Sequence, residues 1–188
     1  MPNYCNNSVS LSFPNQDLYK EFRAFMGDFF SFEKIAPTPT ELLNFSSPIK
    51  DDKLAEVFME KYGAKDWYDW RVKNWGTKWD IDKQEFLAMN SHWKEWEHKD
   101  VVVLDLNFDT AWAPPIEALA VLGKMFPKMN ISIKYFEPGM CFAGESEIVN
   151  GELTECEFEY ESEDYDRIAE HFGHEEWDEL DENTTVNV

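Results

Sequence analysis

The sequence predicts an α+β protein in which an antiparallel sheet carries helices on one face. Three observations predict this fold class. Segments with alternating apolar side chains are interspersed with segments of helical periodicity. An Asn-Gly pair at 150–151 separates two extended segments, and both residue types tolerate the positive φ that a tight hairpin turn needs. The chain has 188 residues, 43% of them hydrophobic and 16% aromatic, and is therefore long enough to bury a core.

The first part of the chain is predicted to form a strand and then helices. Residues 4–13 alternate between apolar and polar side chains, as a strand with one buried face does. A helix is expected after it, with Asn15 or Asp17 as the N-cap. The proline-containing segment 31–50 reads as a loop, and a second helix is expected over about 52–62.

The second part supplies most of the predicted sheet. The β-branched segment 101–112 predicts a strand, and Pro114-Pro115 can open a helix over 116–126. A further strand is expected at 131–136, followed by the hairpin around Asn150-Gly151. The acidic end is expected to form one or two short helices that Gly173 interrupts.

The predicted order of strand, helix, strand, strand, helix, strand is the ferredoxin-like pattern. Its second strand has no clear signal: it begins within 74–81 or lies later in the chain. We divide the chain into a ferredoxin-like domain over 1–160, with an inserted polar segment near 81–99, and an acidic helical tail over 161–188. The fold is thus a ferredoxin-like sheet with an inserted segment and a C-terminal acidic hairpin and helix extension.

The charge of the chain is strongly negative and unevenly distributed. From Gly151 onward there are 15 Asp and Glu residues and one Arg, a net charge of −14 within a total of −21. Such a field repels phosphate groups, so direct binding to nucleic acid or to an anionic membrane is not expected. We expect instead a host protein with a basic, nucleic-acid-binding surface as the partner. The oligomeric state stays open.

We expect a cytoplasmic protein without a cofactor. No apolar run is long enough for a membrane-spanning helix, the N-terminus shows no secretory signal, and three cysteines indicate reduced thiols. Cys141 and Cys156 are predicted to lie on opposite arms of the hairpin, four residues out of register and too far apart for a disulfide.

Four motifs, MPNYCNN, YDWRVKNWGTKWD, FDTAWAPPIEAL and YFEPGMCFAG, resemble the YubB-like ferredoxin-like domain family of plasmid and phage proteins. The resemblance extends over roughly residues 1–155. It implies a ferredoxin-like α+β fold encoded on a mobile genetic element. It implies no established activity, so it assigns no catalytic residue.

The Trp-rich segment 67–80 allows two interpretations. Its rings offer large areas for burial, and Arg and Lys side chains can stack on them, so it forms either a packed aromatic corner or a ligand pocket. Thr110 is expected to cap locally, and Asp109 to pair with Arg71 or Lys78. The pocket, if formed, would comprise Trp70, Arg71, Asn74, Trp75, Lys78, Trp79, Asp109 and Trp112.

The sequence shows no catalytic or metal-binding constellation. His171 and His174 have a spacing that permits ligation on one helix face, but Gly173 lies between them. Cys5 has no nearby base to activate it as a nucleophile. The sequence also lacks a phosphate-binding loop and a nucleophile elbow. We therefore expect no catalytic residue, no metal and no enzymatic activity.

Carboxylates alternate with apolar residues in the second arm of the hairpin. Because a strand directs alternate side chains to opposite faces, we expect one face to carry glutamates about 6.8 Å apart, close to every second phosphate along one DNA strand. This predicted partner-binding face comprises Glu155, Glu157, Glu159, Glu161 and Glu163, with Asp164 and Asp166 beyond them.

These observations favour a non-enzymatic, phage- or plasmid-encoded acidic protein that blocks a host nucleic-acid-handling protein. As an anti-defence inhibitor it would act by DNA mimicry. The alternative is a regulatory or structural interaction module in which the acidic tail aids solubility and docks through Trp177 and Leu180. A small-ligand binder or an enzyme is less favoured.

Overall fold

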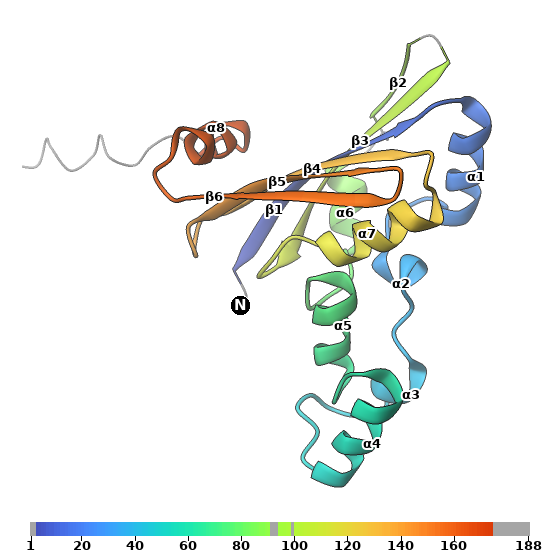
Figure 1. Cartoon of the computed structure of the whole chain (residues 1–188), viewed down its shortest axis with the longest axis vertical. Coiled ribbons are helices and arrows are strands. Elements are labelled where there is room, and N and C mark those ends of the chain that lie inside the picture. The colour runs from blue at the N-terminus through green and yellow to red at the C-terminus, as the bar shows by residue number, and fades with distance from the viewer. Residues whose placement is uncertain (1–2, 91–93, 99, 175–188) are drawn as a thin grey trace, which may run out of the picture.

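The structure is a computed structural model that describes residues 3–90, 94–98 and 100–174 (Figure 1). Its centre is a six-stranded antiparallel sheet with the strand order β2-β3-β1-β4-β5-β6. The strands are β1 (Tyr4–Phe13), β2 (Lys94–His98), β3 (Val101–Ala111), β4 (Asn130–Glu137), β5 (Phe142–Val149) and β6 (Glu152–Phe158).

Helices connect the strands and cover the sheet. Among the described residues, one group of helices lies between β1 and β2, a single helix joins β3 to β4, and one more helix follows β6. The helices are α1 (Gln16–Met26), α2 (Phe32–Ile35), α3 (Thr40–Leu43), α4 (Asp52–Tyr62), α5 (Trp67–Trp75), α6 (Lys83–Met89), α7 (Ile116–Met125) and α8 (Glu163–His171).

The element order confirms the predicted ferredoxin-like α+β fold. Four strands lie side by side in the sheet in the order β2, β3, β1, β4, and helices connect β1 to β2 and β3 to β4. The β5–β6 hairpin extends the sheet beyond β4. Its turn residues Asn150 and Gly151 have φ of 55° and 78°, as the predicted hairpin requires.

The core lies on one face of the sheet, against α1 and α7. Alternation in β1 directs Val9, Leu11 and Phe13 into this core, while serines of the same strand occupy the other face. The cap of α1 is Asn15, whose side-chain oxygen accepts a hydrogen bond from the Leu18 amide at 2.9 Å. These features place the strand and helix predicted for the N-terminal segment.

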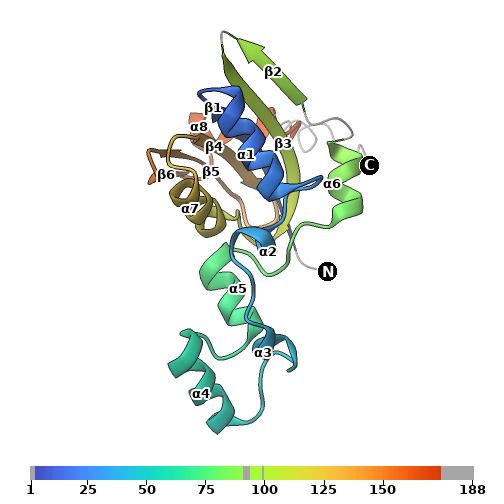
Figure 2. The same cartoon turned by 90° about the vertical axis from the view of Figure 1, so that its right-hand side faces the viewer.

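A helical arm comprising α3, α4 and α5 projects away from the sheet (Figures 1 and 2). The proline-containing segment predicted as a loop includes the two short helices α2 and α3. The side chain of Asp66 caps α5 and also accepts a hydrogen bond from Ser47 Oγ at 2.9 Å. The C-terminal end of α5 packs against α7, so the arm joins the core at this point.

The polar segment 81–99 is part of the fold rather than an insertion. It contains α6 and the edge strand β2, which is the second strand of the ferredoxin-like order. Residues 74–81, where that strand was one alternative, instead end α5 and enter a turn. Asn90 ties α6 to β3, because its side chain donates to Asn107 O at 2.7 Å and accepts from Asn107 N at 2.9 Å. Short, charged β2 lacks the apolar alternation that marks the other strands.

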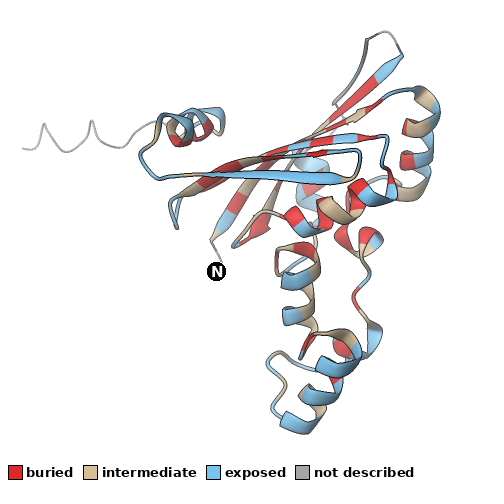
Figure 3. Cartoon of the chain, in the orientation of Figure 1, coloured by how far each residue is buried: buried red, intermediate tan, exposed pale blue. Residues whose placement is uncertain are grey.

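Helix α8 is the exception to the expectation of helices on one face. It packs on the opposite side of the sheet from α7, over β4 and β5 (Figure 1). Buried side chains on α8, β4 and β5 hold it there, and α8 itself has both buried and exposed positions (Figure 3). This small cluster consists of Phe136, Ala143, Tyr165, Ile168 and Ala169. The predicted tail domain thus begins with a helix that belongs to the sheet.

Among the described helices none has the length and apolar character needed to cross a bilayer.

Candidate functional site

The side of the molecule formed by β5, β6 and α8 carries a dense group of carboxylates, which we call the acidic edge. Between residues 145 and 171 the chain has eleven Asp and Glu residues and a single Arg. Most of these acidic residues are exposed. The acidic edge comprises Glu145, Glu147, Glu152, Glu155, Glu157, Glu159, Glu161, Glu163, Asp164, Asp166 and Glu170.

Arg167 compensates only a small part of this charge. Its guanidinium lies 3.5 Å from carboxylate oxygens of both Glu145 and Asp164, and 5.8 Å from the ring centroid of Phe158. All three charged side chains are substantially exposed, so these ion pairs contribute little stability. The acidic edge therefore keeps a large negative charge that no described side chain neutralises.

The acidic edge does not form the predicted row of five glutamates. Strand β6 ends at Phe158, so only Glu155 and Glu157 share a strand face. Beyond the strand the backbone turns, with a φ of 64° at Glu161, and Glu163 is already the first residue of α8. The regular phosphate-like spacing is interrupted because the chain must reverse to place α8 on the sheet.

Three of the predicted partner-binding acids have a structural role at the start of α8. Glu163, Asp164 and Asp166 lie in its first turn, where the helix dipole favours negative charge. Ser162 caps the helix by accepting a hydrogen bond from the Tyr165 amide at 3.2 Å. This part of the acidic edge is explained by helix formation, whereas the glutamates of β6 are not.

A hollow of about 280 Å³ lies beneath β6, and we call it the Glu117 hollow. Its walls combine carboxylates from two distant segments, Glu117 at the start of α7 and Glu155 and Glu157 on β6. Burial of its carboxyl and the nearby charge of Glu155 raise the pKa of Glu117. The lining consists of Val72, Gly76, Ala113, Pro114, Ile116, Glu117, Tyr135, Phe142, Glu155 and Glu157.

Tyr135 places a phenol in the Glu117 hollow. Its side chain is 1% exposed, and its ring lies over Gly144, where any Cβ would approach the hydroxyl to 2.1 Å. Within the described residues the hydroxyl has no hydrogen-bond partner. Burial, followed by the charges of Glu155 and Glu157, raises the pKa of Tyr135, so the phenol stays protonated. The hollow thus offers carboxylates and one neutral hydroxyl on an apolar floor.

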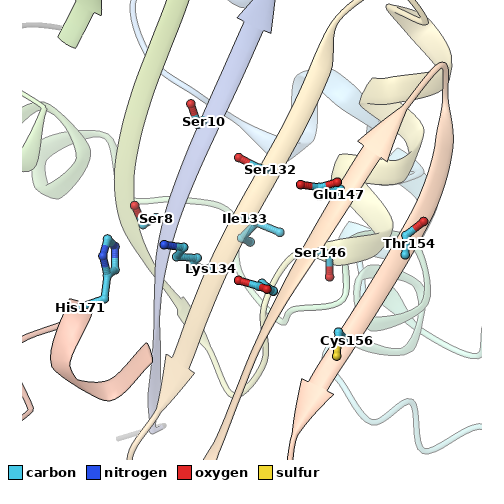
Figure 4. Close-up of a pocket in the computed structure, with 11 residues that line it drawn as sticks. Ser8, Ser10, Ser132, Ile133, Lys134, Ser146, Glu147, Thr154, Cys156 and His171 are labelled. Carbon is cyan, nitrogen blue, oxygen red and sulfur yellow. The ribbon is translucent and has the colours of Figure 1, made fainter. Parts of the chain in front are cut away.

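A second hollow, of about 460 Å³, lies on the opposite face of the sheet, and we call it the serine hollow. Small hydroxyl side chains of β1, β4 and β6 form its floor, and Lys134 extends from β4 toward β1, near Ser8 (Figure 4). Glu147 lies between Ser132 and Thr154, and His171 of α8 lies on the side of β1 (Figure 4). Glu145 is also part of the lining. The floor hydroxyls belong to Ser8, Ser10, Ser132 and Thr154. Its charges are mixed, and no single class of ligand fits it best.

The two histidines of α8 separate in the structure. His171 lines the serine hollow, where burial and the charge of Lys134 lower its pKa. The ring of His174 instead lies 4.8 Å from the ring of Phe136. Among the described residues no group of three His, Cys, Asp or Glu side chains is arranged to hold a metal ion.

The Trp-rich segment forms a packed junction between the arm and the core. Trp75 is fully buried and its indole donates to Ala36 O at 2.8 Å. Arg71 stacks on the rings of Trp67 and Trp75 and forms an ion pair with Glu33 at 2.7 Å. Neither hollow is lined by any of the eight residues predicted as a pocket.

The remaining members of that predicted pocket point elsewhere. Asp109 accepts a hydrogen bond from Asn6 Nδ2 at 2.8 Å. The expected ion pair of Asp109 with Arg71 or Lys78 is not found among the described residues. Asn74 donates back to Trp70 O within α5. Lys78 stacks on the exposed ring of Trp79, and Trp112 is 47% exposed. Residues Trp177 and Leu180, the predicted docking pair of the tail, lie outside the described residues.

The cysteines fit the sequence-based interpretation. Cys141 and Cys156 are exposed and free, and Cys156 is paired with Glu145 across the hairpin as expected. Cys5 is fully buried, and burial raises the pKa of its thiol. A thiol in this environment is a poor nucleophile.

The comparisons with known proteins address the family. A family model described as the ferredoxin-like domain in Api92-like protein matches residues 91–187, which is more than half of the chain. The chain belongs to this family. The matched segment contains β2 to β6 and α8, and therefore the acidic edge and most of both hollows.

The solved structures include one similar protein, the api92 protein from Yersinia pseudotuberculosis. It has 10% sequence identity and a TM-score of 0.40, over 86% of this chain and 99% of that chain. No curated protein matches this sequence. The family assignment thus carries a fold but no activity.

Proposed function

We propose that this protein is a binding protein that engages a cationic surface of a partner protein through the acidic edge. The observation that supports the proposal is the concentration of eleven carboxylates against one arginine on neighbouring elements of a folded sheet. Exposed like charges at this density repel one another and destabilise the fold slightly. A cationic partner would remove that repulsion and be attracted at long range.

The partner class we favour is a host protein that handles nucleic acid. Such proteins carry extended basic surfaces, and an acidic protein that occupies one would block access of nucleic acid. The resemblance of the sequence motifs to plasmid and phage proteins supports placing this chain on a mobile genetic element. Inhibition of a host defence protein is the corresponding role, without a catalytic step.

The proposal is tested by competition with duplex DNA. We expect the protein to displace labelled DNA from a basic host nuclease or restriction complex, and to do so less effectively as salt concentration rises. Replacing Glu155, Glu157, Glu159 and Glu161 together by Gln removes four charges from the acidic edge and should reduce the affinity at least about tenfold.

A matched control removes four charges elsewhere. Gln at Glu21, Glu56, Glu60 and Glu85, which are exposed on α1, α4 and α6, gives the same net charge. This control should bind like the wild-type protein. If both variants lose the same affinity, only overall charge matters and the acidic edge is not the binding surface. If neither salt nor the four substitutions on the acidic edge change the affinity, the result would instead support an interaction module with a solubilising acidic region.

A further inference from the structure

We propose that β6 pairs with an extended segment of the partner, and that an arginine of this segment enters the Glu117 hollow. The inference rests on the proposed function, because it specifies how a cationic partner would meet the acidic edge. It assigns a particular strand and a particular hollow.

The free edge is a consequence of the strand order. Within the part of the chain that the structure describes, β6 pairs with β5 on one side only and is the last strand of the sheet. Val149 and Glu152 are partners across the two-residue turn. In an antiparallel ladder, hydrogen-bonded and non-hydrogen-bonded pairs alternate from such a turn. The backbone groups of Leu153, Glu155 and Glu157 are therefore directed away from β5, toward the free edge.

The Glu117 hollow has the chemistry of a guanidinium site. Carboxylates of Glu117, Glu155 and Glu157 surround an apolar floor that can take the methylene stem of an arginine. The Tyr135 side chain is 1% exposed and lines the hollow, and its hydroxyl, for which no hydrogen bond is found among the described residues, can accept one from the guanidinium. This hydroxyl is an observation independent of the acidic cluster, because it is the polar group of an otherwise buried side chain in the wall of the hollow.

The edge and the hollow are connected through the same residues. Glu155 and Glu157 direct their backbone to the free edge and their side chains to the hollow. In an added strand, the residues opposite them would place their side chains on the same face, about 5 Å away between Cβ atoms. A segment with basic residues at alternate positions would thus pair its backbone with β6 and insert a guanidinium beneath it.

Charge decides between the possible occupants. A second copy of the chain would bring another glutamate-rich β6 against this one, and like charges opposite each other are unfavourable. Residues 175–188 of the chain itself carry six Asp and Glu residues and no Lys or Arg. Both are repelled, whereas a basic segment is attracted.

The test uses a blocked synthetic peptide of seven residues, the length of β6, that alternates threonine and arginine. The control peptide has neutral citrulline at each arginine position. We expect titration calorimetry to detect binding of the arginine peptide but not of the citrulline peptide. In NMR spectra, the arginine peptide should shift backbone signals only in β6 and around the Glu117 hollow. Tyr135→Phe keeps the ring and removes only the hydroxyl, and it should weaken binding about tenfold.

Matched variants separate a specific site from general attraction. Glu155→Gln should weaken peptide binding about threefold to tenfold, whereas Glu56→Gln, the same charge change at an exposed position of α4 outside the acidic edge, should change it less than about twofold. Glu157→Pro blocks an edge-directed amide and should weaken binding well beyond Glu157→Gln. Circular dichroism and thermal melting confirm that each variant is folded.

Several outcomes would overturn the inference. If Glu155→Gln and Glu56→Gln are equivalent and Tyr135→Phe has no effect, attraction is nonspecific and the hollow is not a site, although the proposed function would stand. Absence of arginine-peptide binding would also overturn it, while the DNA-competition experiment would still judge the proposed function. Peptide binding without salt dependence would instead count against the proposed function itself.

Discussion

Asn7 organises the start of β1 through buried hydrogen bonds. Its side-chain amide donates to Cys5 O at 2.9 Å, to Phe108 O at 3.1 Å and to Thr110 Oγ1 at 2.9 Å. Thr110 in turn donates to Ala113 O, in the loop that leads to α7. This network fixes the end of β3 and thereby the position of the α7 N-terminus, where Glu117 lies. Replacement of Asn7 would leave buried acceptors unsatisfied.

The buried thiol of Cys5, next to this network, should react more slowly with thiol reagents than the other two cysteines. Burial and the negative charge of nearby Glu137 raise the pKa of Cys5, whereas Cys141 and Cys156 are exposed. At pH 8 we expect a thiol reagent to modify two cysteines rapidly and the third only on unfolding. Fast modification of all three thiols in the native protein would contradict this placement. A Cys141→Ser, Cys156→Ser variant should show no fast reaction.

At the scale of elements, Gly76 joins the helical arm to the site. It ends α5 with a φ of 85° and lies against the loop before α7. A Cβ at this position would lie 2.2 Å from a Glu117 carboxylate oxygen and 2.7 Å from Pro114 O. Only glycine allows α5 to approach α7 this closely. The junction of these two helices forms part of the Glu117 hollow.

This close approach predicts the effect of an added methyl group. Gly76→Ala should reduce the free energy of unfolding by about 2–4 kcal/mol, from left-handed backbone strain and from the collision with Pro114. Gly173→Ala is the control, because Gly173 has a φ of 76° but nothing within 4 Å. It should cost only the strain, about 1–2 kcal/mol. Urea denaturation measures both, and equal losses would contradict the close packing at Gly76.

Helix α8 contains residues that the sequence pattern assigns to the glutamate row of the preceding strand. Its buried face, with Tyr165, Ile168 and Ala169, packs on Phe136 of β4. Burial raises the pKa of Tyr165 to about 12, and nearby ionisable groups add to the shift. Because α8 packs back on the sheet, the chain must turn after Phe158, and the row of glutamates on β6 ends there.

At the scale of the whole molecule, the uneven charge is the dominant feature. The net charge is −21, and the acidic edge concentrates much of it at one edge of the sheet and on α8. Self-repulsion of this kind weakens the folded state most at low ionic strength, where screening is least.

We therefore expect added salt to stabilise the protein. Raising NaCl from about 10 mM to 150 mM shortens the Debye length from about 30 Å to 8 Å and should raise the melting temperature by several degrees. The Gln variant at Glu155, Glu157, Glu159 and Glu161 should melt higher at low salt and respond less. Calorimetry in sodium chloride checks both. A melting temperature that is independent of salt would show that the carboxylates do not repel one another appreciably.

Much of the fold was predictable because it depends on local patterns. Alternation in residues 4–13 and 101–112, helical periodicity after Pro115 and the Asn150-Gly151 turn each depend on neighbouring residues, and all are observed. Strand β2 was not placed, because its five residues, Lys94–His98, show no apolar alternation in the sequence. Its existence depends on pairing with β3.

The candidate site was predictable only in part. The sequence by itself determined the negative charge, the β5–β6 register and the absence of a compensating group of basic residues in that region, because composition and turn geometry are local properties. Tertiary structure alone decided that Glu117 and Tyr135 join Glu155 and Glu157 in one hollow, and that the glutamate row stops at Phe158. These outcomes depend on how α7 and α8 pack on opposite faces of the sheet. Contacts between side chains that are distant in the sequence determine this packing.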